Sequence, residues 1–299
     1  MKAVILAAFG GADSIDDIEP FLKNIMKGRP LSREAIESAR ERLEKIGGRS
    51  PLLDITLRQA TALEDALKEH GQYRVYVGMR HWHPFIRDTI IKMKEDGIRE
   101  AIALIMAPHQ SDAATGGYIS DVCEALKTTG NIPCITFAKP WHTEPLFIEA
   151  VAENLRDTLK GSSKEKTLVI FTAHSLPVNT VEHDPYVPSI LETIAEVIKN
   201  IPLDWQLSYQ SKGRGPIEWL GPPVEETISA AKDAGYEAIA IAPLGFVSDH
   251  IETLYDIDII FREKAKTLGL KFLRSPSLNT SKPFIHALAN VVRRTNGSI

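Results

Sequence analysis

Short apolar runs alternate with longer amphipathic stretches along the whole chain. The runs have the length and composition of strands, whereas the stretches between them repeat apolar residues with helical spacing. Strands are predicted over residues 2–8, 74–78, 101–107, 133–138, 167–173, 206–209, 238–243 and 271–273. Because strands that alternate with helices usually form parallel sheets with crossover helices on both faces, the pattern predicts an α/β fold.

Local signals place some helix ends. Thr56-Leu-Arg-Gln59 has the pattern of a capping box and predicts a helix that begins there and runs to His70. Pro145 stands where the first residue of another helix is expected, and Gly161 follows the far end of that helix.

The chain repeats part of itself. Glu100-Ala-Ile-Ala103 recurs as Glu237-Ala-Ile-Ala240, an offset of 137 residues (237 − 100), and the polar stretch 161–166 resembles a linker. We therefore expect two similar Rossmann-like lobes, each a parallel sheet flanked by helices. The N-terminal lobe would span residues 1–160, and the C-terminal lobe would span 161–299.

Composition narrows the possible functions. The 299 residues suit two domains, and 43% hydrophobic with 25% charged residues is ordinary for a soluble globular protein. The formal net charge of −4 gives no reason to expect a nucleic-acid partner. No apolar run approaches the roughly 18 to 20 residues of a membrane span, so we expect a cytoplasmic protein without a signal peptide.

Two cofactor classes are disfavoured. Cys123 and Cys134 are the only cysteines, too few to hold an iron–sulfur cluster, and two free thiols in a reducing compartment are expected. The turn Phe9-Gly-Gly-Ala12 follows the first predicted strand but lacks the G-x-G-x-x-G spacing of a dinucleotide site. The spacing of a P-loop is missing as well, which disfavours ATP.

His174 directly follows the predicted strand 167–173, at the end of a strand where open α/β sheets place their ligands. Neutral imidazole can bind a borderline metal ion or accept a proton near neutral pH. The alternative is a structural histidine, hydrogen-bonded into the turn that Ser175-Leu-Pro177 predicts.

Glu252 follows the predicted strand 238–243. Ser248 or Asp249 would cap a helix that runs to about Leu268, and a carboxylate in its first turn is stabilised by the helix dipole whatever its function. Asp249, Glu252 and Asp256 would share one face of that helix, at i, i+3 and i+7. Such a line suits a path for divalent metal, and a solvated acidic face is the alternative.

Several motifs occur together and in a fixed order. They are Ile46-Gly-Gly-Arg-Ser-Pro-Leu52, Ala107-Pro-His-Gln-Ser111 with Tyr118 after it, Phe171-Thr-Ala-His-Ser-Leu-Pro177, Asp184-Pro-Tyr186, Tyr209-Gln-Ser211 with Trp219-Leu-Gly-Pro222, and Phe246 to Asp256. In these segments the chain resembles the ferrochelatases, enzymes that insert ferrous iron into a porphyrin in haem biosynthesis. The resemblance covers nearly the whole chain.

The resemblance implies roles for individual residues. His174 and Glu252, in the C-terminal lobe 161–299, would be the catalytic, iron-handling pair, and the N-terminal lobe 1–160 would carry the porphyrin-binding loops. Ser50 and Tyr118 match positions that contact the porphyrin, and Arg42 matches a basic position near its propionates, which a planar guanidinium suits.

Two departures from the family bear on the substrate. Phe9 stands where some relatives that act on coproporphyrin have a tyrosine able to coordinate iron, and it would instead pack against the macrocycle. Another form of that group reads F-G-G here, as does Phe9-Gly-Gly11, which favours coproporphyrin III over protoporphyrin IX. Ile260 replaces a glutamate of many relatives, so an outer metal site is in doubt.

The resemblance also implies the ligands and partners. Ferrous iron would be a substrate, no cofactor would stay bound, and the partners would be the porphyrin and its metalloporphyrin product. We expect a monomer that makes at most transient contact with a membrane or another haem-pathway enzyme. The alternatives are a cobalt chelatase of cobalamin synthesis, a non-catalytic porphyrin or haem carrier with His174 as axial ligand, and a Rossmann-like protein that binds an unrelated small molecule.

Overall fold

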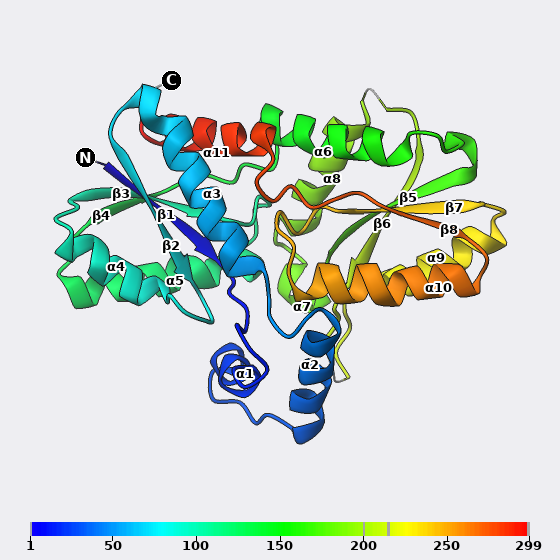
Figure 1. Cartoon of the computed structure of the whole chain (residues 1–299), viewed down its shortest axis with the longest axis horizontal. Coiled ribbons are helices and arrows are strands. Elements are labelled where there is room, and N and C mark those ends of the chain that lie inside the picture. The colour runs from blue at the N-terminus through cyan, green and yellow to red at the C-terminus, as the bar shows by residue number, and fades with distance from the viewer. Residues whose placement is uncertain (1, 200, 214–215, 298–299) are drawn as a thin grey trace. The chain divides into compact units, whose positions relative to one another are not determined.

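The computed structural model describes residues 2–199, 201–213 and 216–297. The chain forms two compact units, each built around its own parallel sheet (Figure 1). Unit 1 comprises Met1–Ala107, Thr115–Pro140 and Asn279–Ile299, and unit 2 comprises Pro108–Ala114 and Trp141–Leu278.

The sheet of unit 1 has the strand order β2-β1-β3-β4, and neighbouring strands are parallel. Its strands are β1 (Lys2–Ala8), β2 (Tyr73–Met79), β3 (Glu100–Ile105) and β4 (Cys134–Phe137). Successive residues Val4, Ile5 and Leu6 of β1 are all fully buried, so both faces of this strand are covered. An uninterrupted apolar run is what a parallel strand covered on both faces requires.

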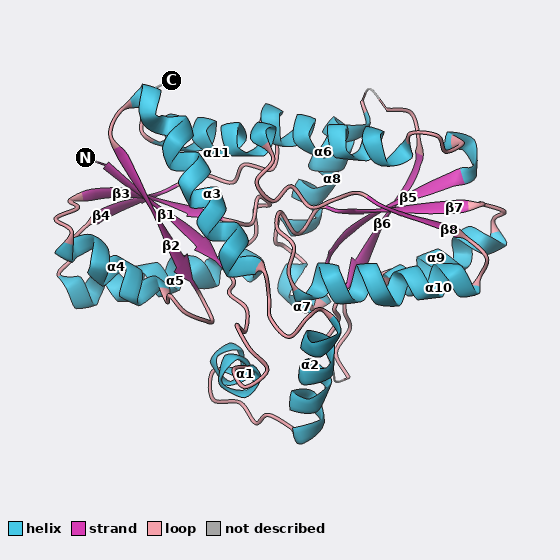
Figure 2. Ribbon diagram, in the orientation of Figure 1, coloured by secondary structure: helices cyan, strands magenta, loops and turns pink. Residues whose placement is uncertain are grey.

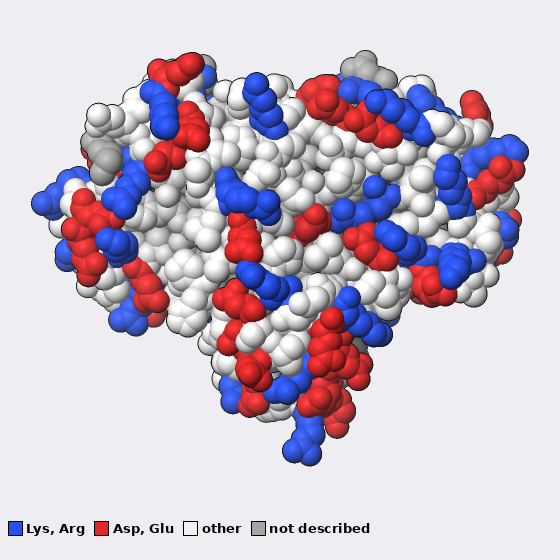
Figure 3. Space-filling model, in the orientation of Figure 1, with Lys and Arg blue, Asp and Glu red and all other residues white. Residues whose placement is uncertain are grey.

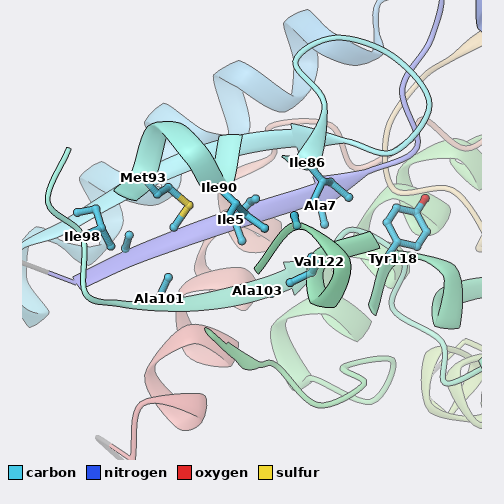
Figure 4. Close-up of a cluster of buried hydrophobic side chains, with 12 residues drawn as sticks. Ile5, Ala7, Ile86, Ile90, Met93, Ile98, Ala101, Ala103, Tyr118 and Val122 are labelled. Carbon is cyan, nitrogen blue, oxygen red and sulfur yellow. The ribbon is translucent and has the colours of Figure 1, made fainter. Parts of the chain in front are cut away.

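Helices cover the two faces of this sheet (Figure 2). One face packs against α4 (Ile86–Glu95) and α5 (Asp112–Thr129), in the cluster of Figure 4, where Ile5 meets Ile90 and Val122. The other face packs against α3 (Leu52–Leu67), which contacts α11 (Lys282–Thr295). The chain after β1 forms α1 (Ile18–Met26) and α2 (Arg33–Lys45), and a short 3₁₀ turn, Lys68–His70, follows α3.

Unit 2 repeats the arrangement with the strand order β6-β5-β7-β8, again parallel. Its strands are β5 (Thr167–His174), β6 (Asp204–Gln210), β7 (Ala238–Pro243) and β8 (Lys271–Arg274). The helices on one face are α6 (Pro145–Leu159) and α8 (Tyr186–Ile198); those on the other are α9 (Val224–Asp233), a π-helix (Glu252–Phe261) and α10 (Arg262–Thr267). Two single turns complete the unit, Lys164–Lys166 and α7 (Val178–Val181).

The predicted fold class is confirmed. Every strand predicted from the sequence is present, with ends that differ by at most two residues. The repeated Glu-Ala-Ile-Ala segments lie at the start of β3 and β7, which hold equivalent positions in the two strand orders. β1 and β5 are equivalent in the same way, so Phe9 and His174 both stand at the carboxyl end of the corresponding strand.

The units differ from the division predicted at residue 160. Helix α6 belongs to unit 2, where it packs against α8, β7 and β8. Helix α11 belongs to unit 1, because its partner there is α3. Each helix thus belongs to the unit that it packs against, and its position in the sequence does not decide the unit.

The predicted start of α3 was wrong. The helix begins at Leu52, so Thr56 lies in its second turn, and the Thr56 hydroxyl donates to the carbonyl of Leu52 at 2.7 Å. Thr56 and Gln59 are both buried in the unit. The capping-box pattern therefore came from two buried polar residues inside the helix.

Charged side chains of both signs mix on the face that Figure 3 shows, including the surface of α2. No helix among the described residues combines the length and the apolar character needed to cross a bilayer. Cys123 and Cys134 are both exposed free thiols.

A buried histidine links three segments of unit 2. His109 Nε2 lies 3.2 Å from the hydroxyl of Thr193, and that hydroxyl donates to the carbonyl of His142 at 3.0 Å. Burial lowers the pKa of His109 to about 3, and nearby His142 contributes in the same direction. His109 is therefore neutral in the folded protein over the whole physiological range.

This burial predicts acid sensitivity. The unfolded chain takes up a proton on His109 below about pH 6.5 and the folded chain only near pH 3, so the free energy of unfolding falls as the pH drops between these values. At about pH 5 the loss from this group is about 2 kcal/mol. Urea unfolding at about pH 7.5 and pH 5 should show a smaller pH dependence for His109→Asn than for the wild type. An unchanged dependence would contradict the assignment, and His70→Asn, on an exposed turn, is the control.

Candidate active site

The carboxyl end of β5 carries His174, and hydrogen bonds on both sides fix its backbone. The Tyr186 hydroxyl donates to the His174 carbonyl at 3.0 Å, and the Ser175 amide donates to the carbonyl of Gln210, at the end of β6, at 2.8 Å. This is the edge of a parallel sheet at which α/β proteins place ligands.

The His174 ring has a defined orientation. Its Nδ1 lies 2.6 Å from the carbonyl oxygen of Ser175. A carbonyl only accepts, so Nδ1 carries the hydrogen and, in the neutral ring, Nε2 offers a lone pair. The turn hydrogen bond considered as the structural alternative is thus present, and it leaves the second nitrogen available for chemistry.

Glu252 is the first residue of the π-helix, in a segment predicted as an ordinary α-helix from Ser248 or Asp249 to about Leu268. The hydrogen bonds of a π-helix run from residue i to i+5, and such turns are frequent at functional sites. Ile257 and Phe261 hold this helix against β5 and β7, with exposed fractions of 0% and 2%. From Arg262 onward the segment continues as α10.

The structure brings His174 and Glu252 together. His174 Nε2 lies 3.9 Å from Glu252 Oε1, and the side chains are 38% and 23% exposed. Metal bonds to histidine nitrogen and carboxylate oxygen are each about 2.1 Å, so one ion placed between these atoms can touch both. Within the described ranges no cluster of three or more His, Cys, Asp or Glu side chains is arranged to hold a metal. A pair with open coordination positions suits an ion that is passed on rather than stored.

Ser211 joins Glu252 to a second carboxylate. Its hydroxyl lies 2.8 Å from Glu252 Oε2 and 3.1 Å from Asp256 Oδ2. Ser211 also adopts a left-handed backbone conformation with φ of 61°, which is uncommon for a residue other than glycine. The hydroxyl has one hydrogen, so it donates to one carboxylate at a time. The second short contact joins the hydroxyl oxygen to the other carboxyl group. It is favourable when that carboxyl carries a proton, which it can donate to the hydroxyl oxygen, or when a cation lies nearby.

Asp249 does not extend this pair into a line of acids. Its carboxylate accepts hydrogen bonds from Ser277 at 2.8 Å and Thr253 at 3.2 Å, and it pairs with Arg274. The predicted acidic face therefore separates into two parts. Glu252 and Asp256 meet at Ser211, whereas Asp249 belongs to an ion-pair group at the end of β8.

Sequence reasoning assigned no role to Ser211, His250 or Arg274. Ser211 and His250 lie inside motifs that the family resemblance includes, but their contacts link segments far apart in the chain. His250 Nδ1 lies 3.1 Å from the Ser248 carbonyl, and burial, the largest effect, lowers the pKa of its ring. No sequence signal marked Arg274.

The remaining predicted residues, Phe9, Arg42, Ser50 and Tyr118, belong to unit 1, whereas His174 and Glu252 belong to unit 2. Phe9 is 40% exposed and lies at 4.5 Å, between ring centroids, from His81. Burial lowers the pKa of His81 to about 4, so this ring is a neutral partner at physiological pH. Phe9 thus presents an apolar surface, and the tilted His81 ring packs against it.

Ser50 and Tyr118 are more buried than a role in substrate contact suggests. Ser50 is 3% exposed, and its hydroxyl accepts from the Leu52 amide at 3.4 Å. Gly11 packs so closely that a Cβ there would lie 2.5 Å from the Ser50 hydroxyl oxygen, which places Ser50 beside the turn after Phe9.

Tyr118 is 7% exposed and packs in the core cluster (Figure 4). Arg80 lies over its ring at 5.3 Å. Burial also raises the pKa of the Tyr118 hydroxyl. Arg42 lies on α2 and is partly buried. Its proposed role near propionates stays a prediction.

Solved structures share this fold. SirB from Bacillus subtilis with Fe3+ superposes with a TM-score of 0.60 and 14% identity, covering 99% of this chain and 95% of that chain. CbiX, described as the terminal enzyme of sirohaem biosynthesis in denitrifying bacteria, gives a TM-score of 0.57 with 9% identity and covers 98% and 99% of the two chains. At these identities the likeness concerns the fold.

Sequence relatives carry the assignment further. A ferrochelatase of Geotalea uraniireducens (strain Rf4) is 39% identical, with 99% of this chain and 98% of that protein covered. A coproporphyrin III ferrochelatase of Anoxybacillus flavithermus (strain DSM 21510 / WK1) is 37% identical, with 98% and 95% covered. The ferrochelatase family model matches residues 1–296. The resemblance carried by the motifs is thereby confirmed, and the chain belongs to the ferrochelatase family.

Proposed function

We propose that this chain inserts ferrous iron into a porphyrin, with coproporphyrin III preferred over protoporphyrin IX. The observation that carries the proposal is the pair His174 and Glu252, 3.9 Å apart at the carboxyl end of β5. Family membership supports the reaction, and the geometry of the pair supports these residues as its centre. Iron enters as substrate, and no cofactor stays bound.

Metal insertion exchanges one divalent ion for the two pyrrole N–H protons. The lone pair of His174 Nε2 and the carboxylate of Glu252 would both contact Fe²⁺ as it arrives, because one ion fits between them. The iron then moves to the porphyrin nitrogens as these lose their protons. An enzyme that binds the bent macrocycle better than the flat one lowers this barrier, because bending exposes the nitrogen lone pairs.

The released protons need acceptors. Glu252 accepts one, and the Ser211 hydroxyl lies in hydrogen-bond contact with both Glu252 and Asp256. A hydroxyl that donates to one carboxylate while accepting from the other can pass a proton between them. The carboxylate pair would thus take up protons at the site while His174 holds the metal.

The preference for coproporphyrin III rests on the turn after β1 and on the names of two relatives. Phe9-Gly-Gly11 matches one form of the coproporphyrin group, and relatives named coproporphyrin III ferrochelatase include those of Anoxybacillus flavithermus and Halalkalibacterium halodurans. Coproporphyrin III carries propionates where protoporphyrin IX carries vinyl groups. Arg42 would bind propionate through its planar guanidinium.

The catalytic pair is tested by substitution. Anaerobic turnover of ferrous iron and porphyrin, followed by the Soret and visible bands, should fall at least about 100-fold in His174→Ala and Glu252→Ala. Porphyrin affinity, measured by fluorescence quenching, should change little. The exposed residues His183 and Glu263 provide matched control variants, His183→Ala and Glu263→Ala. Tight binding by the wild-type protein without turnover would contradict the proposal and favour a carrier.

Ser211 offers a test that separates chemistry from backbone strain. Ser211→Ala loses the hydroxyl and keeps the left-handed conformation, whereas Ser211→Gly loses the hydroxyl and relieves the strain. A hydrogen bond to a charged group contributes about 1.5–3 kcal/mol, so both variants should lose about tenfold or more in kcat. The glycine variant should melt at a higher temperature than the alanine variant. Recovery of full turnover in Ser211→Gly would show that the hydroxyl has no role in the reaction.

A competition assay tests which porphyrin is the preferred substrate. With equal coproporphyrin III and protoporphyrin IX, kcat/KM should favour coproporphyrin III by about tenfold or more, the effect of roughly one added charge-assisted contact. Arg42→Gln should lower kcat/KM for coproporphyrin III more than it lowers kcat/KM for protoporphyrin IX. A preference for protoporphyrin IX in the wild type would overturn the substrate assignment and leave the catalytic pair untouched.

A further inference from the structure

Arg274, the last residue of β8, connects two points of the segment that contains Glu252. Its Nη2 donates to Asp249 Oδ1 at 2.5 Å, and its Nε lies 3.2 Å from Asp258 Oδ1. The Arg274, Asp249 and Asp258 side chains are 14%, 17% and 22% exposed. The same Asp249 oxygen accepts from the Ser277 hydroxyl, so the ion-pair group is tied to the chain after β8 as well.

Asp249 precedes the helix, whereas Asp258 lies inside the π-helix Glu252–Phe261. Arg274 therefore ties the chain just before the helix to a residue within it. Because Arg274 belongs to β8, this bridge holds Asp258 at a fixed place beside the sheet and limits how the helix can be wound between its start and Asp258.

The winding of the helix decides the direction of the Glu252 carboxylate. Glu252 and Phe261 are the first and last residues of the π-helix and are nine residues apart (261 − 252), about two turns of such a helix. Phe261 is 2% exposed in the core against the sheet. With π-winding, Glu252 lies on the same side of the helix as Phe261 and reaches Ser211 and His174 at the strand ends. With α-winding it would be turned about half a revolution away.

We propose that Arg274 is a positioning residue that selects the π-winding of 252–261, by bridging Asp249 and Asp258, and so turns Glu252 toward His174. Its catalytic consequence rests on the proposed function, whereas its effect on the helix does not. Arginine suits this task because its planar fork presents separate nitrogens to two carboxylates, whereas the single ammonium of lysine is a point charge.

The test compares substitutions at two arginines that share one carboxylate. Arg274→Lys keeps the charge and loses the fork. Arg262 also pairs with Asp258, at 3.4 Å, but from four residues further along the same helix. Arg262→Lys is therefore the matched control, since it alters the charge group around Asp258 without removing the tie from β8.

In Arg274→Lys, amide hydrogen exchange over 252–261 should become at least about tenfold faster, with α9 and the sheet unaffected. Its kcat for metal insertion should fall about tenfold or more, while the porphyrin dissociation constant stays within about twofold of the wild-type value. Arg262→Lys should stay within about twofold of wild type in all three measurements. Unchanged exchange over 252–261 in Arg274→Lys would overturn the proposal, whatever the activity.

A double variant separates positioning from general stability. If Arg274 acts through Glu252, adding Arg274→Lys to Glu252→Gln should cause no further loss of kcat, since the two substitutions remove one function. A further loss equal to that in the single variant would show that Arg274 acts elsewhere.

If Arg274→Lys does not fold, Asp258→Asn removes one end of the bridge and should give the same faster exchange; normal exchange there overturns the proposal. If the wild-type protein shows no insertion with any porphyrin, the proposed function fails, and the exchange measurement alone decides the role of Arg274.

Discussion

The placement of one carboxylate depends on an unusual helical turn. Over Glu252–Phe261 the hydrogen bonds run from i to i+5, and this wide winding brings Glu252 to the side of the helix that faces the sheet. Ile257 and Phe261 anchor the helix in the core beneath it. Glu252 then reaches both the Ser211 hydroxyl and the vicinity of His174 Nε2. If the same residues were wound as an α-helix, the Glu252 carboxylate would point in a different direction from the helix axis.

The two sheets use the same topology for different chemistry. β1 and β5 are equivalent strands, and the residues at their carboxyl ends, Phe9 and His174, are an apolar ring and an imidazole. In unit 1 this position is surrounded by aromatic neighbours, including His81 and Phe21. In unit 2 it faces the Glu252 carboxylate, which in turn contacts the Ser211 hydroxyl. The repeated fold thus presents different chemistry at two equivalent strand ends.

The sheets could be predicted from the sequence because parallel strands covered on both faces leave uninterrupted apolar runs, as in Val4-Ile5-Leu6. Helix starts were harder. Thr56 and Gln59 have the spacing of a capping box but lie inside α3, where burial in the unit determined their identity. Spacing alone cannot distinguish a polar residue that caps a helix from one that is buried within it.

The candidate site was predictable in part. The strand ends and the motifs predicted that His174 and Glu252 lie together, and they do in the structure. The acidic line was wrong at Asp249, because the helix begins after this residue and its carboxylate pairs with Arg274 of β8. Ser211 and Arg274 were missed because their partners are distant in sequence. Burial of Ser50 and Tyr118 depends on packing by Gly11 and Arg80, which no local pattern reveals.

His174 and Glu252 are proposed to receive the divalent metal together. Anomalous X-ray scattering from crystals soaked anaerobically with ferrous iron locates the ion without requiring turnover. A peak is expected within about 2.3 Å of both His174 Nε2 and a Glu252 carboxylate oxygen. A peak at other side chains, with none at this pair, would show that the metal is received elsewhere.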